Sequence, residues 1–177
     1  MFRRKEKPDD GVVVVRTFEL DADVIEKFRA VVDMCKEVYC CLGKGFAESV
    51  YEEALCVELQ QRGIQYVSQE TIPLYYKERF IGNIRLDILL HSWLPFIFEL
   101  KSVSSCIQTD ERWQLVRYMT RKNVPYGAVV NFNQSISKGL EVSFVVEHDG
   151  RHYILNIDTL EGKLLKDAHF QIVLNDV

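Results

Sequence analysis

Apolar and polar residues recur with two different periods along the chain, and the two periods predict where helices and strands lie. Between residues 21 and 42, apolar residues recur every three or four positions, which predicts an amphipathic helix capped by Asp21. A second helical pattern runs from about Phe46 to Arg62 and ends at Gly63. A third helix is predicted over residues 109–122. The apolar stripe of the second helix consists of Val50, Ala54, Leu55 and Leu59.

Short apolar or alternating runs between these helices predict strands. Pro73 lacks a backbone N–H group, so we expect its strand at a sheet edge or Pro73 at a strand start. Asp149-Gly150 predicts a tight turn between two strands of a hairpin. The expected strands cover residues 12–18, 64–70, 72–77, 80–90, 96–101, 126–132, 140–148, 152–157 and 170–174.

The order of these elements predicts an α/β fold with a mixed central sheet flanked by helices. The strands at 80–90 and 96–101 are joined by a short break, so they are expected to be antiparallel neighbours. The helix between 96–101 and 126–132 makes a right-handed crossover, which would make these two strands parallel. We expect an N-terminal segment at 1–20, a core at 21–133 and a β-rich C-terminal extension at 134–177, packed on the same domain.

Composition narrows the class of protein. The 177 residues are 47% hydrophobic and 27% charged, as expected for one globular domain. No apolar run approaches the roughly 18 residues of a membrane span, so we expect no membrane contact. The net charge of −4 argues against a nonspecific nucleic-acid coat protein but is compatible with an acidic metal site.

The five cysteines are odd in number and form no C-x-x-C pair. This predicts reduced thiols in an intracellular protein, which is cytoplasmic or, in a eukaryote, nuclear. His148 and His152 are four residues apart, but the turn between them and the lack of obvious further ligands disfavour a zinc site.

Charged residues interrupt the two apolar strands at 80–90 and 96–101. Asp87 stands between Leu86 and Ile88, and Glu99 and Lys101 flank Leu100. Residues two apart on a strand share a face, so Glu99 and Lys101 are expected to project together, with Asp87 on the neighbouring strand. Burying carboxylates is costly, and a hard divalent cation such as Mg²⁺ offsets that cost. An isolated E-x-K pattern is more often a solvated ion pair, so the pattern needs support from other parts of the chain.

Such support comes from a series of motifs in a fixed order. Residues 45–51 read G-x-x-E-x-x-Y, with Glu48 in the first turn of a predicted helix. A glutamate at this position can also serve only to stabilise the helix, through its favourable interaction with the helix dipole. Asp87, the E-x-K pair, Gln114-x-x-x-Tyr118 and Asn131-Phe132 follow. Together these motifs resemble the GxxExxY family, a branch of the PD-(D/E)XK nuclease superfamily. The resemblance covers about residues 24–133, and every acidic and lysine position is present. The one departure is Leu86, which stands where the superfamily motif has proline.

The resemblance implies a restriction-endonuclease-like core and a metal-dependent nuclease that hydrolyses phosphodiester bonds, and it implies this scaffold more firmly than a substrate. Our first hypothesis for the substrate is DNA in preference to RNA. The implied cofactor is Mg²⁺ or Mn²⁺. Its expected ligands are Asp87, Glu99 and the Leu100 carbonyl, with Glu48 bound directly or through water. The implied catalytic residues are Glu48, Asp87, Glu99, Lys101, Gln114 and Tyr118.

The expected partner is nucleic acid, and the chain offers several candidate contacts. Arg85, Arg117 and Arg121 are candidates for binding phosphates, although each could serve surface solubility instead. The C-terminal extension is a candidate surface for a homo-oligomer or a partner protein. Two alternatives stay open: a nucleic-acid-binding or protein-interaction module on a nuclease fold with little or no catalysis, and an α/β protein whose acids form surface ion pairs.

Overall fold

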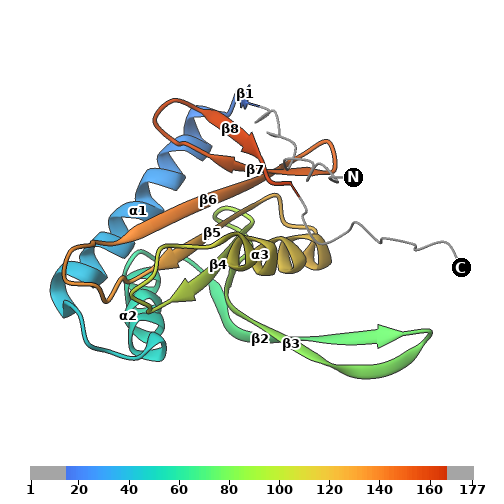
Figure 1. The fold of residues 1–177 in the computed structure, drawn as a ribbon, viewed down its shortest axis with the longest axis horizontal. Coiled ribbons are helices and arrows are strands. Elements are labelled where there is room, and N and C mark those ends of the chain that lie inside the picture. Colours follow the sequence, from blue (N-terminus) through green and yellow to red (C-terminus); the bar gives the residue numbers. More distant parts are fainter. Residues whose placement is uncertain (1–14, 167–177) are drawn as a thin grey trace, which may run out of the picture.

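The computed structural model describes residues 15–166, which form one eight-stranded sheet with three helices (Figure 1). The strand order is β1-β8-β7-β6-β5-β4-β3-β2. The helices are α1 (Ala22–Leu42), α2 (Glu48–Gln61) and α3 (Thr109–Lys122). The strands are β1 (Val15–Thr17), β2 (Tyr66–Tyr76), β3 (Arg79–Leu90), β4 (Phe96–Lys101), β5 (Tyr126–Asn131), β6 (Glu141–His148), β7 (Arg151–Leu155) and β8 (Glu161–Leu164).

The sheet is mixed, as the order of elements predicted. Strands β4 and β5 are parallel and are joined by the crossover through α3. The other neighbouring strands pair in antiparallel fashion, including β3 with β4. The predicted α/β class and the predicted pairing of β3, β4 and β5 are therefore confirmed.

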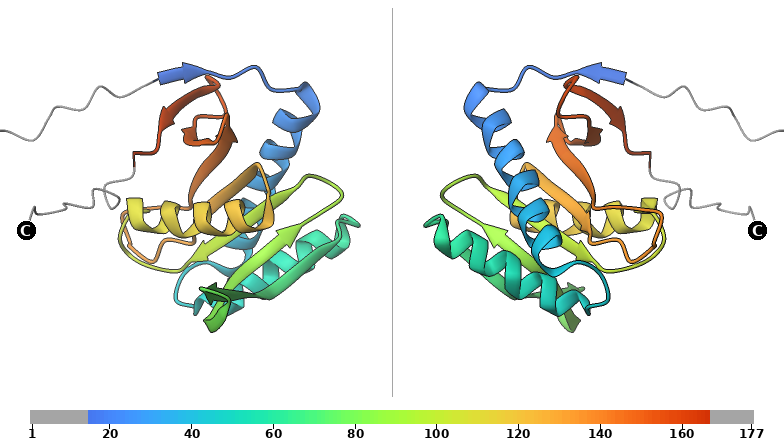
Figure 2. Two further views of the ribbon diagram at one scale, coloured as in Figure 1. Left: turned by 90° about the vertical axis from the view of Figure 1, so that its right-hand side faces the viewer. Right: turned by 90° about the vertical axis from the view of Figure 1, so that its left-hand side faces the viewer.

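The helices lie on opposite faces of the sheet, with α1 and α2 on one face and α3 on the other (Figure 2). Side chains along β4 alternate between the two faces of the sheet and pack in both hydrophobic layers. Phe96, Phe98 and Leu100 pack with α1 and α2, whereas Ile97 packs with α3. Glu99 and Lys101 follow Ile97 in the same alternation, and a strand buried on both sides must therefore accommodate them. No helix in residues 15–166 is long and apolar enough to cross a membrane.

The structure differs from the sequence-based expectations in three respects. The two strands expected at 64–70 and 72–77 form one strand, β2, because β2 is the sheet edge and Pro73 needs no outer hydrogen-bond partner there. Val50 was expected in the buried stripe of α2 but is 38% exposed. Strand β8 was not predicted, because its four residues include a glycine and two charged side chains. The strand expected at 170–174 lies outside the described residues.

The hairpin of β2 and β3 extends well beyond the body of the molecule (Figure 1). Its strands are 11 and 12 residues long, and it turns at Lys77 and Glu78. The inner end of the hairpin, around Asp87, joins the central sheet through the pairing of β3 with β4.

Candidate active site

The candidate site lies where β3 separates from β4. The pairing of these strands reaches Ile88, opposite Phe98, and goes no further toward Leu86. Beyond that point, the Leu100 N–H donates a hydrogen bond to the Asp87 Oδ2 atom, at 2.7 Å. A side-chain carboxylate thus takes the place of a backbone carbonyl in the sheet. This contact fixes Asp87 beside the residues that flank Leu100.

Glu99 and Lys101 lie at the end of β4. Glu99 is only 1% exposed, and its Oε1 atom accepts a hydrogen bond from the Lys101 Nζ atom at 2.5 Å. Its other oxygen, Oε2, is buried and has no hydrogen-bond partner within residues 15–166. A buried carboxylate oxygen without a partner is costly, and such a group calls for a functional explanation.

The G-x-x-E-x-x-Y segment places Glu48 at the first position of α2. The Ser102 Oγ atom donates to the Phe46 carbonyl at 2.9 Å, which ties the loop before α2 to the end of β4. The Tyr51 hydroxyl donates to the Gly43 carbonyl at 2.8 Å, and the Tyr51 ring stacks on Phe132 at 4.5 Å between centroids. The motif tyrosine therefore packs in the core and positions the acidic residue of the motif.

The carboxylates of the site influence one another. Burial, followed by the charge of Asp87, raises the pKa of Glu99 to about 7. Burial also raises the pKa of Glu48 and of Asp87 above their ordinary values. Burial alone would lower the pKa of Lys101, but the hydrogen bond to Glu99 and the nearby carboxylates outweigh it and raise the pKa. Lys101 therefore stays protonated, next to carboxylates whose own pKa values are raised.

Gln114 and Tyr118 come from α3, on the opposite face from α2. The Gln114 Nε2 atom donates to the Tyr118 hydroxyl at 3.1 Å, and this hydroxyl donates to the Arg85 carbonyl at 2.9 Å. Burial and the charges of Glu99 and Asp87 raise the pKa of Tyr118. The structure therefore brings Gln114 and Tyr118 to the same site, where they hold β3 against α3.

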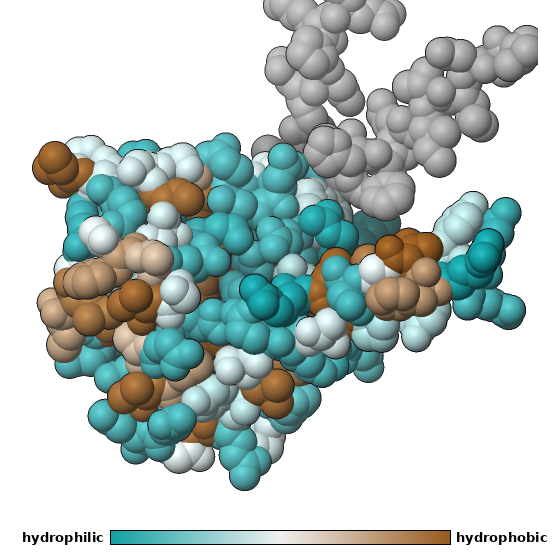
Figure 3. Space-filling model, turned by 90° about the horizontal axis from the view of Figure 1, so that it is seen from below, coloured by the Kyte–Doolittle hydropathy of each residue, from teal (hydrophilic) through white to brown (hydrophobic). Residues whose placement is uncertain are grey.

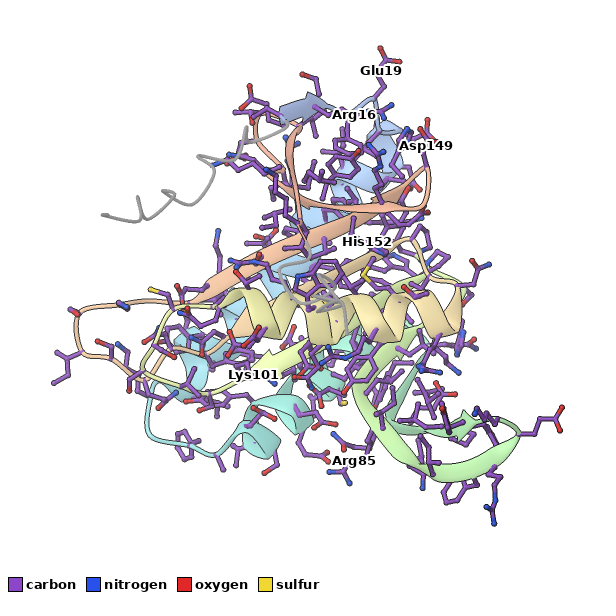
Figure 4. All side chains as sticks on the ribbon, turned by 45° about the vertical axis from the view of Figure 1, so that its right-hand side comes forward. Arg16, Glu19, Arg85, Lys101, Asp149 and His152 are labelled. Atoms are coloured by element: carbon purple, nitrogen blue, oxygen red, sulfur yellow. The ribbon has the colours of Figure 1, made fainter. Side chains whose placement is uncertain are left out.

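The three predicted arginines are placed differently. Burial raises the pKa of Asp87 and of Glu52, and the Arg85 charge offsets part of both shifts, so Arg85 belongs to the surroundings of the site. Figure 4 shows Arg85 and Lys101 on the same side of α3. Arg117 and Arg121 are exposed on α3, and within residues 15–166 no contact joins either of them to the acidic residues.

Two residues of this site, Glu52 and Gln69, were not assigned a role from the sequence. Glu52 is 7% exposed, and its Oε2 atom accepts a hydrogen bond from the Gln69 Nε2 atom at 2.5 Å. Burial raises the pKa of Asp87, and a hydrogen bond from Gln69 offsets a small part of that rise. The i,i+4 spacing of Glu48 and Glu52 was the available signal for Glu52. The sequence contained no signal for Gln69. Its backbone has a positive φ of 55° within β2, and the sequence pattern did not predict this conformation.

The acidic side chains of the site supply some of the features that a divalent cation requires. Within residues 15–166, no three His, Cys, Asp or Glu side chains already stand close enough together to hold a metal ion. Asp87 and Glu99 nevertheless supply oxygen donors of the kind that Mg²⁺ prefers, and Glu99 has a buried oxygen with no partner in the described part of the chain. A cation would satisfy that oxygen and offset both causes of the raised pKa of Glu99, which are burial and then the charge of Asp87. The residues therefore fit the cation in chemistry and charge, with two carboxylates at the centre.

A mixed α/β sheet that carries two carboxylates and a lysine where two strands separate is consistent with a restriction-endonuclease-like fold. A family model of the PD-(D/E)XK nuclease superfamily matches residues 26–142. The chain belongs to this superfamily, whose members are generally hydrolytic nucleases that use divalent metals. Comparison with curated proteins gave no match, and comparison with solved structures gave none.

Proposed function

We propose that the protein is a Mg²⁺- or Mn²⁺-dependent nuclease of the GxxExxY branch, which hydrolyses phosphodiester bonds in DNA in preference to RNA. The main support for the proposal is the buried Glu99 carboxylate beside Asp87, with one oxygen bound to Lys101 and the other without a partner among residues 15–166. A buried carboxylate oxygen without a hydrogen-bond partner destabilises the folded protein unless a bound ligand contacts it.

Asp87, Glu99 and the Leu100 carbonyl would hold the cation, and Glu48 would reach it directly or through water. When bound, Mg²⁺ or Mn²⁺ supplies neutralisation of phosphate charge and acidification of a water molecule. The two central carboxylates come from neighbouring strands, which fixes their relative position more rigidly than a loop would.

Lys101 would act as a cation and not as a general base. Its hydrogen bond to Glu99 raises its pKa, so it keeps its proton at neutral pH. From that position the ammonium group would orient the attacking water or stabilise the charge that develops near the scissile phosphate. Gln114 and Tyr118 would position Lys101 or the nucleic-acid backbone from α3, which packs on the face of the sheet shared by Ile97, Glu99 and Lys101.

Metal titration and DNA cleavage on the same samples test this proposal. We expect calorimetry to show Mg²⁺ and Mn²⁺ binding to the wild type, and expect cleavage of single-stranded or duplex DNA. Glu99→Gln should abolish both, and Lys101→Ala should reduce cleavage by at least about a hundredfold. Glu26→Gln is the matched control, because it removes one exposed carboxylate from α1 and should change neither. Full cleavage by both site variants would disprove the assignment.

A nucleic-acid-binding module with little catalysis is the second candidate. It is supported by the absence, within residues 15–166, of a ready-made group of three metal-binding side chains. DNA binding by the wild type without metal-dependent cleavage would favour this candidate. RNA cleavage under the same conditions would keep the nuclease but overturn the preference for DNA.

A further inference from the structure

One face of the hairpin of β2 and β3 is exposed over the outer part of the hairpin, from Arg85 to the tip. Residues that pair directly across two strands point to the same face. Three such pairs form this face, and all six side chains are exposed. We call it the outer face of the hairpin; its pairs are Thr71 with Arg85, Pro73 with Asn83, and Tyr75 with Phe80.

A bulge places the aromatic pair on this face. Leu74 pairs with Gly82, but the next residue, Tyr75, pairs with Phe80, so Ile81 is an extra residue in β3. Without the bulge, alternation along β3 would put Phe80 on the opposite face from Arg85. The register shift thus joins Tyr75 and Phe80 to the row that begins at Arg85.

The opposite face of the hairpin is already in use. The Lys122 Nζ atom of α3 forms an ion pair with the Glu70 Oε1 atom at 2.5 Å. Ile72 and Ile84 pack against the hydrophobic cluster under α3. The outer face has no such cover within residues 15–166. Figure 3 shows the hairpin standing clear of the body with hydrophobic and polar side chains exposed on it.

The chemistry of the outer face fits a polyanion with flat apolar groups. The face carries Arg85 and no carboxylate, and Lys77 and Arg79 at the tip outnumber Glu78 there. This local positive charge contrasts with the net charge of −4 of the whole chain. Tyr75 is 63% exposed and Phe80 is 58% exposed, with their rings edge to face at 6.0 Å between centroids. Exposed aromatic rings beside cations are the usual platform on which unpaired bases stack.

We propose that the outer face of the hairpin binds a single-stranded stretch of the polynucleotide substrate, with bases stacked on Tyr75 and Phe80 and a phosphate on Arg85. This inference rests on the proposed nuclease function. Arg85 already influences the pKa of Asp87, so the outer face is continuous with the candidate active site. Phe80 is seven residues from Asp87 along β3, or about 20 Å, which corresponds to about six stacked nucleotides.

Fluorescence anisotropy with labelled 20-nucleotide single-stranded DNA tests the outer face, in EDTA so that cleavage does not consume the probe. The double variant Tyr75→Ala/Phe80→Ala should bind at least about tenfold more weakly than the wild type. Tyr76→Ala is the matched control, because Tyr76 is also an exposed tip aromatic, 61% exposed, but pairs with Arg79 on the opposite face. It should bind within about twofold of the wild type.

Cleavage kinetics add a second readout with a length dependence. With Mg²⁺ present, the double variant should raise KM for a 20-nucleotide substrate and leave kcat unchanged. A substrate with only three nucleotides on either side of the cut would not reach the tip, and its kinetics should not change.

The outcomes separate this inference from the nuclease proposal. If the double variant binds DNA as tightly as the wild type and still cleaves it, the outer face has no role in binding, but the nuclease proposal is unaffected. A wild type that neither binds nor cuts DNA or RNA overturns both. A dimer that dissociates in the double variant, measured by light scattering, would show that a second copy occupies the face and would also overturn the inference.

Discussion

Glu99 is the residue where the cost of burial and the requirement of function conflict most directly. It is 1% exposed in the central strand β4, yet one of its oxygens has no hydrogen-bond partner within residues 15–166. Lys101 compensates one oxygen, and the neighbouring Asp87 adds repulsion. Without a cation, the protein is therefore expected to favour protonation of Glu99 at a pH where exposed glutamates are ionised.

The raised pKa of Glu99 predicts a pH-dependent stability. In the folded protein the pKa is about 7, against an ordinary value of 4.5. Between these values the folded state binds more protons than the unfolded state, so the free energy of unfolding falls as the pH rises. In EDTA, the stability of the wild type relative to Glu99→Gln should therefore be highest below pH 4.5 and decline until about pH 7. The total decline should be on the order of 3 kcal/mol.

Urea denaturation of both proteins at intervals of pH measures this difference. Glu26→Gln serves as the control, since its exposed carboxylate should give a nearly constant difference from the wild type. A wild-type stability that runs parallel to that of Glu99→Gln across this range would show that Glu99 ionises normally in the fold.

Among the elements, the hairpin of β2 and β3 carries local strain at its tip. Its turn has two central residues, Lys77 and Glu78, with φ values of 46° and 65°. Two-residue turns with positive φ at both positions strongly prefer Asn-Gly or Gly-Gly. Side chains other than glycine are disfavoured in this region of backbone conformation, by about 1–2 kcal/mol per residue. The tip therefore adopts a tight turn without the residues that favour it most.

Glu78→Gly should relieve this strain and stabilise the folded protein by about 0.5–1 kcal/mol. Glu78→Ala is the matched control, because it removes the same carboxylate but keeps a Cβ atom at positive φ. Thermal unfolding of the two variants beside the wild type gives the comparison. Equal shifts for glycine and alanine would mean that charge, and not backbone strain, dominates at the tip.

Element prediction worked best where one periodicity was strong and uninterrupted. Helix α1 was predicted from its regular apolar spacing, and apolar residues at that spacing, such as Phe28, Val31 and Cys35, are buried. Strand β8 was not predicted, because it is short and polar and shows no clear periodicity. Its place in the sheet depends on Gly162, where an added Cβ atom would lie 2.3 Å from the Phe18 ring. That close approach between distant parts of the chain leaves no local signal.

At the scale of the whole molecule, the site draws on α2, β2, β3, β4 and α3. Glu48 and Glu52 come from one layer, Asp87 and Glu99 from the sheet, and Tyr118 from the other layer. These elements come together only in the folded state. A cation that binds to this site should therefore stabilise the entire domain against unfolding.

Mg²⁺ at about 100 times its dissociation constant should therefore raise the Tm of the wild type by about 5 °C or more at pH 8. Glu26→Gln should show the same increase, because its carboxylate is exposed on α1 and is not one of the site residues. Glu99→Gln should show little or none. An equal increase in all three proteins, measured by differential scanning calorimetry, would place the bound cation elsewhere on the molecule.

The sequence by itself determined the parts of the site that depend on local spacing. Alternation along a strand placed Glu99 and Lys101 on the same side of β4, and a short connection made β3 and β4 antiparallel neighbours, with Asp87 beside Glu99. Helical periodicity likewise placed Glu48 at the start of α2. These relations hold because backbone geometry fixes the direction of side chains that are close in sequence.

Only the tertiary structure decided how distant segments complete the site. The pairing of Glu52 with Gln69, the use of the motif residue Tyr51 as a core contact with Phe132, and the contact of Tyr118 with the Arg85 carbonyl each join separate elements. The open outer face of the hairpin likewise depends on a register shift at Ile81. Such contacts follow from how layers pack and how strands pair over long distances, which local patterns do not encode.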